Sequence, residues 1–316
     1  MVALVIRRSK NNFVVQVSEG KINQKVECRI KGKILKEAEG YYNPLAPGDM
    51  VDVDIEKGLI LGLRERKNKF TRFNQKGQKP QIIASNVDLV LCVSSVDAPP
   101  FRPRFIDRAL VQADEAEIPA AIICNKYDLA GDGAFADPDV EERLSDFERI
   151  NCPVFRISVY SGQGLNDLKE FIAGKFSVLM GQSGVGKSSI VNALSPGLDI
   201  KTGMINDRYN RGSHTTTQPM LFDLPGMPAG TRIIDTPGIR RFAPAGIPAE
   251  DLILYMREFA PLAGKCSFGL SCTHETERGC KIMEAVDAGV IHEDRYESFL
   301  RIREELLGKG GYPDSD

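Results

Sequence analysis

Alternating apolar and polar residues mark the first part of the chain. The alternation runs through residues 12–17, 26–33, 49–56 and 59–66, with glycine, proline or asparagine between the stretches. A period of two is typical of β-strands that bury one face, and glycine and proline mark the turns between them. About five short strands without a strong helical stretch predict a small β-barrel such as an OB-fold. A generic small β domain would have the same periodicity.

Compact apolar runs replace this alternation in the middle of the chain. Runs at 87–93, 120–124, 154–157, 176–180 and 232–234 alternate with predicted helices near 104–116, 138–150, 165–173 and 187–195. Strands that are buried on both faces read as continuous apolar runs, and the helices between them cross over the sheet. The pattern predicts an α/β domain whose parallel sheet is covered by helices on both faces.

Two further segments complete a predicted division into three domains. Residues 67–80 are polar and basic, which is typical of a linker. From about residue 248 the chain is predicted to be mainly helical, with a last helix at 293–307. The predicted domains are therefore 1–72, 73–247 and 248–316.

Composition narrows the class of protein without identifying it. Hydrophobic residues make up 42% and charged residues 27% of the 316 residues, as in soluble globular proteins. No apolar stretch reaches the roughly 18–20 residues of a membrane helix, and the N-terminus lacks the order of a secretory signal. The seven cysteines do not form a disulfide framework, so we predict a cytoplasmic protein. No heptad pattern is present, which favours a monomer.

Charge is unevenly distributed along the chain. Residues 1–80 contain 17 Lys and Arg and 9 Asp and Glu, a net charge of +8, whereas the remainder contains 24 and 34, a net charge of −10. A basic N-terminal part favours a polyanionic partner such as nucleic acid, although a solvated basic surface is the ordinary alternative. The run Arg64–Lys69 with Arg72 is usually just a solvated strand end and linker. The neighbouring rings of Phe70 and Phe73 make an RNA contact more plausible, because bases stack on aromatic rings.

A glycine-rich loop lies between the predicted strand 176–180 and the predicted helix 187–195. Its sequence fits the pattern GxxxxGK[ST], in which backbone N–H groups wrap a phosphate. Lys187 would reach the β- and γ-phosphates, and Ser188 would ligate Mg²⁺. A glycine-rich turn without a ligand is the alternative. The candidate phosphate-binding residues are Gly181, Gln182, Ser183, Gly184, Val185, Gly186, Lys187 and Ser188.

Two more motifs follow predicted strands. Asp235 and Gly238 belong to a DTPG sequence, in which the carboxylate can hold Mg²⁺ through water and the glycine N–H can reach a γ-phosphate. Asn125-Lys126-Tyr127-Asp128 matches the NKxD guanine signature of GTPases. The Asp128 carboxylate can accept hydrogen bonds from guanine N1–H and the 2-amino group, a donor pair that adenine lacks.

The remaining base-site residues follow from the same signature. Asn125 would support the loop and the purine edge, and the aliphatic stem of Lys126 would pack on the base plane. Ser158 follows the run 154–157, at the place of the second base loop of GTPases.

The order of these motifs is unusual. Most GTPases place the phosphate loop first, then DxxG, then NKxD and the second base loop. Here the base loops at 125 and 158 precede the phosphate loop at 181 and DTPG at 235. This order predicts a circular permutation of the GTPase domain, which joins the DTPG segment directly to residues 248–316.

A cysteine and histidine cluster lies in the C-terminal part. Cys266, Cys272, His274 and Cys280 follow the spacing C-x5-C-x-H-x5-C. Three thiolates and an imidazole are sufficient for a closed tetrahedral zinc site, in which the metal is structural because no coordination position stays open. Free cysteines in a helical domain are the alternative.

Together these motifs give the sequence a strong resemblance to the ribosome small-subunit-dependent GTPase A family of bacteria. The resemblance spans nearly the whole chain. It implies an N-terminal OB domain, a circularly permuted GTPase domain and a C-terminal zinc domain. It also implies GTP hydrolysis to GDP stimulated by the small ribosomal subunit, a role in late maturation of that subunit, and contacts of the OB and zinc domains with rRNA.

The resemblance implies further site residues. Residues 211–217 match the switch I region of the family, where a threonine binds Mg²⁺ and the γ-phosphate, and Thr216 is chosen over Thr215. Ser189 belongs to the matched phosphate loop. Ile239 stands where many GTPases have a glutamine that orients the attacking water, so intrinsic hydrolysis is expected to be slow. His214 is the candidate for that role, with a solvent-exposed loop histidine as the alternative.

Other functions are compatible with the same motifs. One alternative is a nucleotide-switched RNA-binding protein in which hydrolysis only resets binding. Another is a permuted GTPase whose partner is a membrane or cytoskeletal target, which the absence of an apolar anchor disfavours. Asp128 disfavours an ATPase.

Overall fold

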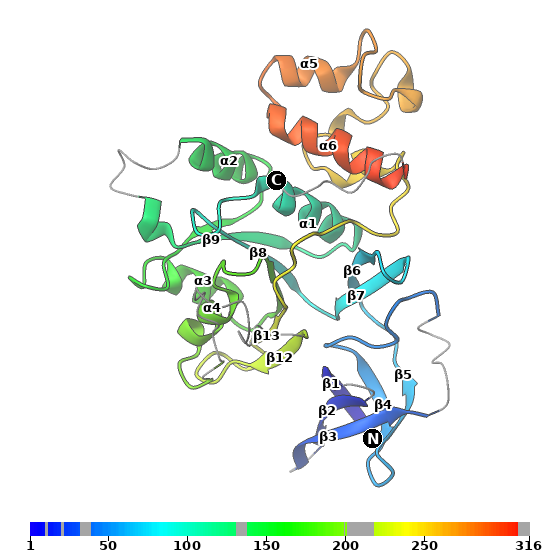
Figure 1. The fold of residues 1–316 in the computed structure, drawn as a ribbon, viewed down its shortest axis with the longest axis vertical. Coiled ribbons are helices and arrows are strands. Elements are labelled where there is room, and N and C mark those ends of the chain that lie inside the picture. The colour runs from blue at the N-terminus through cyan, green and yellow to red at the C-terminus, as the bar shows by residue number, and fades with distance from the viewer. Residues whose placement is uncertain are drawn as a thin grey trace.

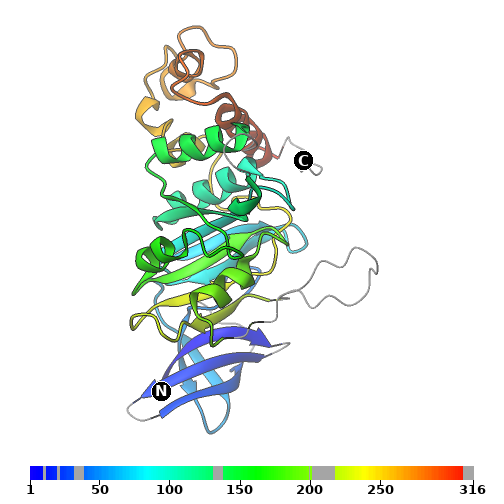
Figure 2. The ribbon, with the colours of Figure 1, turned by 90° about the vertical axis from the view of Figure 1, so that its left-hand side faces the viewer.

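The structure is a computed structural model in which three parts follow one another along the longest axis of the molecule (Figures 1 and 2). The five-strand barrel lies at one end, the mixed sheet with its helices in the middle, and the last helices at the other end. The structure describes residues 1–9, 12–19, 22–31, 39–130, 138–198, 200 and 218–308.

The N-terminal part is a closed five-strand barrel, as the sequence predicts. Its strands are β1 (Val2–Ser9), β2 (Asn12–Glu19), β3 (Ile22–Ile30), β4 (Met50–Asp54) and β5 (Leu59–Leu63). Strand β1 pairs with both β2 and β4, and β3 pairs in parallel with β5, so the order around the barrel is β1-β2-β3-β5-β4. This Greek-key closure is that of an OB-fold.

Strand β1 was not assigned from the sequence, and its packing gives the reason. Ala3 and Val5 point into the barrel core, whereas Leu4 and Ile6 pack into the core of the central part. Because both faces of the strand are buried, the residues do not alternate between apolar and polar.

The central part is built on six strands. They are β8 (Leu89–Ser95), β9 (Ala120–Asn125), β10 (Val154–Arg156), β11 (Phe176–Gly181), β12 (Met220–Asp223) and β13 (Arg232–Asp235). Their order is β10-β9-β8-β11-β13-β12, and the first five are parallel. Strand β12, which the sequence did not predict, is antiparallel to β13.

Helices cover both faces of this sheet, as predicted. Helices α1 (Pro103–Glu115) and α2 (Pro138–Arg149) share one core with Val90 and Cys92 of β8. Helices α3 (Leu165–Ile172) and α4 (Lys187–Leu194) share the other with Leu89 and Leu91 of the same strand. Alternate residues of one strand therefore pack into two different cores, one on each face of the sheet.

The prediction that residues 67–80 form a linker is wrong. Most of it forms a β-hairpin of β6 (Lys69–Asn74) and β7 (Lys79–Ser85). The segment looks like a linker because its exposed face is basic, but Phe70 is fully buried in the central core. Phe70 is therefore not available to stack on RNA, whereas Phe73 is partly exposed.

The barrel and the central part share one sheet. Arg7 of β1 pairs with Met220 of β12, which joins the strands of both parts into an eleven-stranded sheet. The barrel is thus attached to the strand that follows residues 211–217 in the sequence.

The described residues of the C-terminal part form two α-helices, α5 (Lys281–Asp287) and α6 (Glu293–Leu306), and the predicted helix 293–307 is confirmed. Single 3₁₀ turns at Leu252–Tyr255, Ala260–Leu262 and Gly269–Ser271 precede them. His292 caps α6, because its Nδ1 accepts a hydrogen bond from the Asp294 N–H at 3.1 Å. Within the residues described, no helix combines the length and the apolar character that a membrane span requires.

Candidate nucleotide site and metal centre

The glycine-rich loop turns from the end of β11 into the start of α4. Gly184 and Gly186 have φ values of 88° and 96°, which favour glycine because they lie in the left-handed region. A Cβ on Gly186 would lie 2.3 Å from the Asn125 Nδ2 atom. The loop and Asn125 therefore pack in direct contact, at the carboxyl ends of the parallel strands β11 and β9, which flank β8 in the sheet.

Lys187 and Ser188 at the end of the loop have hydrogen-bond partners within the protein. The Lys187 ammonium donates to the carbonyls of Gly181 and Gln182 at 3.0 and 2.7 Å, and the Ser188 hydroxyl donates to Asp235 Oδ2 at 2.8 Å. Burial lowers the pKa of Lys187 to about 8, and the nearby Asp235 only partly opposes this. A bound phosphate would accept the hydrogen bonds that Lys187 now donates to these two carbonyls, and its negative charge would neutralise the ammonium.

The DTPG segment lies directly on the loop. The Thr236 hydroxyl donates to the Leu179 carbonyl at 2.6 Å, and the Ile239 N–H donates to the Gly181 carbonyl at 3.1 Å. A Cβ on Gly238 would lie 2.6 Å from the Ser183 nitrogen, so only glycine permits this approach. Asp235 and Gly238 are thus both next to the predicted phosphate loop.

The base loops meet the phosphate loop through Asn125. Its Nδ2 donates to the Val185 carbonyl at 2.8 Å, and its Oδ1 accepts from the Val159 N–H at 3.4 Å. Asp128 is exposed at the 3₁₀ turn Tyr127–Ala130, and the Lys126 ammonium donates to the Ala98 carbonyl.

The second base loop adjoins the first. The Tyr127 N–H donates to the Ile157 carbonyl at 3.0 Å, which joins the two loops. Ser158 is buried, and its hydroxyl accepts a hydrogen bond from the Ser161 N–H at 3.1 Å. The side chain of Ser158 therefore shapes this loop, while Tyr160 is largely exposed.

Two predicted residues are not described. His214 and Thr216 belong to 201–217, which lies outside the described residues. Ile239, at the position of the water-orienting glutamine of many GTPases, is described and is buried in the central core.

The four predicted metal ligands are brought together and are buried. The ligand atoms of Cys266, Cys272, His274 and Cys280 lie within 4.8 Å of one another. His274 Nδ1 is 3.6 Å from Cys266 Sγ and 3.4 Å from Cys280 Sγ, and these two sulfur atoms are 3.9 Å apart. Tetrahedral zinc with usual bond lengths separates such atoms by about 3.6–3.8 Å. The donor set therefore fits a four-coordinate metal ion.

Residues that the sequence analysis did not single out support this centre. The Lys281 N–H donates to Cys266 Sγ at 3.2 Å, and the Tyr296 hydroxyl donates to the His274 carbonyl at 2.6 Å. The ring of Phe299 lies edge-on to His274, 5.9 Å between centroids. The sequence carried no signal for these contacts, because they join the ligand loop to helices whose packing is tertiary.

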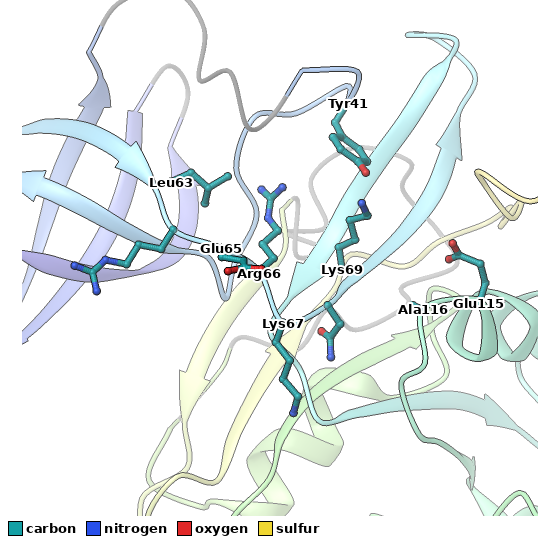
Figure 3. A pocket seen from close by; sticks show the side chains of 10 residues that line it. Tyr41, Leu63, Glu65, Arg66, Lys67, Lys69, Glu115 and Ala116 are labelled. Carbon is teal, nitrogen blue, oxygen red and sulfur yellow. The ribbon is translucent and has the colours of Figure 1, made fainter.

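The basic run Arg64–Lys69 lines a cavity of about 390 Å³ between the barrel and the hairpin (Figure 3). Arg64, Arg66 and Lys67 form ion pairs with Asp52, Asp49 and Asp88 at 2.8, 2.7 and 3.0 Å, respectively. Lys69 lies over the ring of Tyr41, 5.0 Å from its centroid. Much of the positive charge of this run is therefore paired with carboxylates of the same chain.

Comparison with known sequences identifies similar proteins. A family model described as RsgA GTPase matches residues 63–244. The chain is 35% identical over 315 residues to the "Small ribosomal subunit biogenesis GTPase RsgA" of Chlorobaculum parvum, covering 96% of this chain and 97% of that protein. It is 37% identical over 293 residues to the protein of the same name from Gemmatimonas aurantiaca, covering 90% and 92%.

Solved structures show the same architecture. The chain is similar to YjeQ from Thermotoga maritima, with a TM-score of 0.72, 30% identity and coverage of 97% of this chain and 98% of that one. It also resembles YloQ, described as a circularly permuted GTPase, with a TM-score of 0.68, 24% identity and coverage of 98% and 96%. The second likeness concerns the fold alone.

Proposed function

This chain belongs to the RsgA GTPase family and is a GTP-hydrolysing enzyme, and we propose that it acts in the maturation of the small ribosomal subunit. The observation that carries the proposal is the convergence of three motifs at one edge of the sheet. Asn125 contacts both Val185 and Gly186 of the glycine-rich loop, and Gly238 contacts Ser183 of the same loop. The NKxD motif proposed for the base and the DTPG motif proposed for the γ-phosphate thus both contact the loop proposed for the phosphates.

Each residue of this site has a proposed role. Asp128 selects guanine through its N1–H and 2-amino group, Asn125 and Ser158 shape the base loops, and Lys126 packs on the base. Backbone N–H groups of the phosphate loop bind the phosphates, and the Lys187 ammonium neutralises them. The residues proposed for the phosphate loop are Gly181, Gln182, Ser183, Gly184, Val185, Gly186, Lys187, Ser188 and Ser189.

Two metal ions fit the donor sets of the chain. Ser188, Asp235 through water, and Thr216 are proposed to hold Mg²⁺, which neutralises phosphate charge when bound. Cys266, Cys272, His274 and Cys280 are proposed to hold one structural zinc ion, because thiolates and imidazole are the ligands that zinc prefers.

The attacking water needs a group outside the DxxG motif. The buried side chain of Ile239 has no atom that can accept a proton or orient water. We propose His214 for this role, and we propose that binding to the subunit brings His214 to the water and so accelerates hydrolysis.

The partner is proposed to be the small ribosomal subunit and its rRNA, in the cytoplasm, with the chain acting as a monomer. The similar proteins are named for small-subunit biogenesis, and the net charge of +8 on residues 1–80 suits a polyanion. The domains are proposed to divide at 1–72, 73–247 and 248–316. A nucleotide-switched RNA-binding protein is the second candidate, favoured by the apolar Ile239, since slow turnover would suit a binding switch.

The decisive experiment measures GTP hydrolysis with purified small subunits, with large subunits as control and ATP as competitor. Stimulation by small subunits alone is expected. Hydrolysis that no particle accelerates, combined with GTP-dependent binding to small subunits, would support the second candidate instead.

Two variants test the residue roles. Asp128→Asn should shift preference from guanosine to xanthosine nucleotides, and an unchanged preference would contradict the base-site assignment. His214→Ala should remove most of the stimulated turnover and leave GTP binding intact; unchanged stimulated turnover would contradict its role.

A further inference from the structure

The chain that leaves Gly238 is held at several points within seven residues. Ile239 and Phe242 are buried in the central core. The Ala243 carbonyl accepts a hydrogen bond from the Phe73 N–H of β6 at 2.9 Å. The Ala245 N–H donates to Gln112 Oε1 of α1 at 2.7 Å. The path of this segment is therefore fixed by the hairpin on one side and by α1 on the other.

Phe242 is the apolar anchor of the segment. Its ring stacks on Phe70 of β6, with centroids 5.8 Å apart and planes 16° from parallel. It also meets Phe105 of α1 edge-on, at 6.2 Å and 68°. Such offset and edge-on pairs add a directional preference to burial, so they fix the orientation of the ring as well as its depth.

Gln112 is the polar anchor. Its side chain is fully buried on α1, and Oε1 accepts from Ala245 while Nε2 donates to Glu115 Oε2 at 2.6 Å. A buried amide with a main-chain partner sets the register of that main chain, because a shifted loop would leave both groups without a hydrogen bond.

Gly238 depends on this register. It lies against the glycine-rich loop so closely that a Cβ would be 2.6 Å from the Ser183 nitrogen, and the next residue donates to the Gly181 carbonyl. A main-chain donor loses its hydrogen bond when the acceptor moves beyond about 3.5 Å. A small shift of the segment would therefore remove the contact between the Gly238 N–H and a γ-phosphate.

We propose that Phe242 and Gln112 are positioning residues for recognition of the γ-phosphate. The inference rests on the proposed nucleotide site. Both residues act through Gly238, whose N–H has the proposed role of reaching the γ-phosphate, which GDP lacks. Their loss reduces the affinity for GTP and leaves the affinity for GDP intact, so the anchors set the discrimination between the two nucleotides.

The test compares the binding of GDP and of a non-hydrolysable GTP analogue, both with Mg²⁺, to the full chain. The variants are Phe242→Leu, which shortens the anchor without emptying its site, and Gln112→Met, which removes the acceptor at similar volume. Phe259→Leu is the control, because Phe259 is equally buried and stacks on Phe299 at 5.2 Å, within the C-terminal core.

We expect each anchor variant to bind the GTP analogue about 10-fold more weakly and GDP less than about two-fold more weakly, as suits a coupling through one contact. The control should preserve the wild-type ratio. Equal losses for both nucleotides, or an unchanged ratio, would overturn the inference while guanine-nucleotide binding still stands. A wild-type chain that binds neither nucleotide would overturn the proposed site and this inference together. Retained GDP binding also reports that a variant is folded.

Discussion

The barrel and the C-terminal part are attached to opposite ends of the central part by different chemistry. The barrel is attached through apolar side chains and main-chain hydrogen bonds. Leu4 and Ile6 pack into the central core, and the buried Asn43 forms two hydrogen bonds with the main chain of Ile82 at 2.9 Å each. Of the three ion pairs near this junction, Arg64–Asp52 and Lys67–Asp88 are exposed, and only Arg66–Asp49 is buried.

The C-terminal part is attached through buried charges. Asp107 of α1 is fully buried and pairs with Arg295 of α6 at 2.7 Å, while Arg295 also binds Glu258. Ser298 donates to the second oxygen of Asp107, and Arg143 of α2 lies 3.5 Å from the first. Buried ion pairs hold only in a narrow geometry, because a displaced charge stays desolvated.

The two junctions also differ in the elements of the central part that they contact. Phe105 and Gln112 are seven residues apart on α1, on the face that contacts the segment after Gly238. Asp107 and Val111 belong to another face of α1, which contacts the C-terminal part. Helical spacing thus places one helix between the proposed nucleotide site and the part that contains the cysteine and histidine cluster. The barrel contacts the central sheet through β12 instead.

The largest effect is expected at the metal centre. Removing the proposed zinc ion with a chelator, or replacing Cys272 by Ala, should unfold the loop 266–280, because structural zinc contributes on the order of 10 kcal/mol to small domains. Metal content and circular dichroism measure this, since the chain has no tryptophan. Cys28→Ala, a buried cysteine in the barrel outside the cluster, should keep the metal. Retained helicity and metal in Cys272→Ala would exclude a structural role.

A smaller effect is expected at the buried charges. Asp107→Ala removes a buried partner that Arg295 and Arg143 share and leaves them with Glu258 and Asp146, respectively, so it should destabilise the C-terminal junction by up to about 3–5 kcal/mol. Calorimetry should resolve a separate, earlier transition for the C-terminal part. Glu297→Ala, which removes the partly exposed pair with Arg104, provides the matched comparison and should leave one transition. A single unshifted transition in Asp107→Ala would mean that the buried pair does not hold this junction.

The barrel junction should respond more weakly. Asn43→Ala leaves the buried main-chain groups of Ile82 unpaired, at a cost of about 1–3 kcal/mol. We expect faster limited proteolysis between the barrel and β6, without loss of metal. Proteolysis at the wild-type rate would mean that the hydrogen bonds of Asn43 do not hold the barrel in place.

The smallest effect is expected for the exposed ion pair. Lys67→Ala should change stability by less than about 1 kcal/mol, because the side chains of Lys67 and Asp88 are 68% and 42% exposed. Burial raises the pKa of Asp88, but the Phe176 N–H and Lys67 outweigh it and lower the pKa below 3.8.

This lowered pKa fixes the sign of the pH dependence. The stabilisation from Asp88 is present above its ordinary pKa and is lost as the pH falls through the lowered value. Denaturant titrations of wild type and Lys67→Ala at pH 7 and at acid pH should converge in acid, and a gap that widens in acid would contradict this assignment.

Sequence alone determined the chemistry and much of the fold of this protein. The motifs around Lys187, Asp128 and Cys272 are local in sequence, so their spacing predicted a phosphate, a guanine and a metal site without coordinates. Local periodicity likewise predicted the barrel and the covered parallel sheet, because one strand or helix buries one face in a regular pattern. The reversed order of the motifs predicted the permutation.

Only the tertiary structure decided how these parts are held together. The sequence did not predict strand β1, because both of its faces are buried. It did not predict the hairpin β6–β7, because the exposed face of the hairpin is basic. The hydrogen bond from the Ala245 N–H to Gln112 joins residues 133 positions apart, and Arg295 donates to Asp107 across 188 positions. Such contacts follow from the packing of whole elements, which no local pattern of residues encodes.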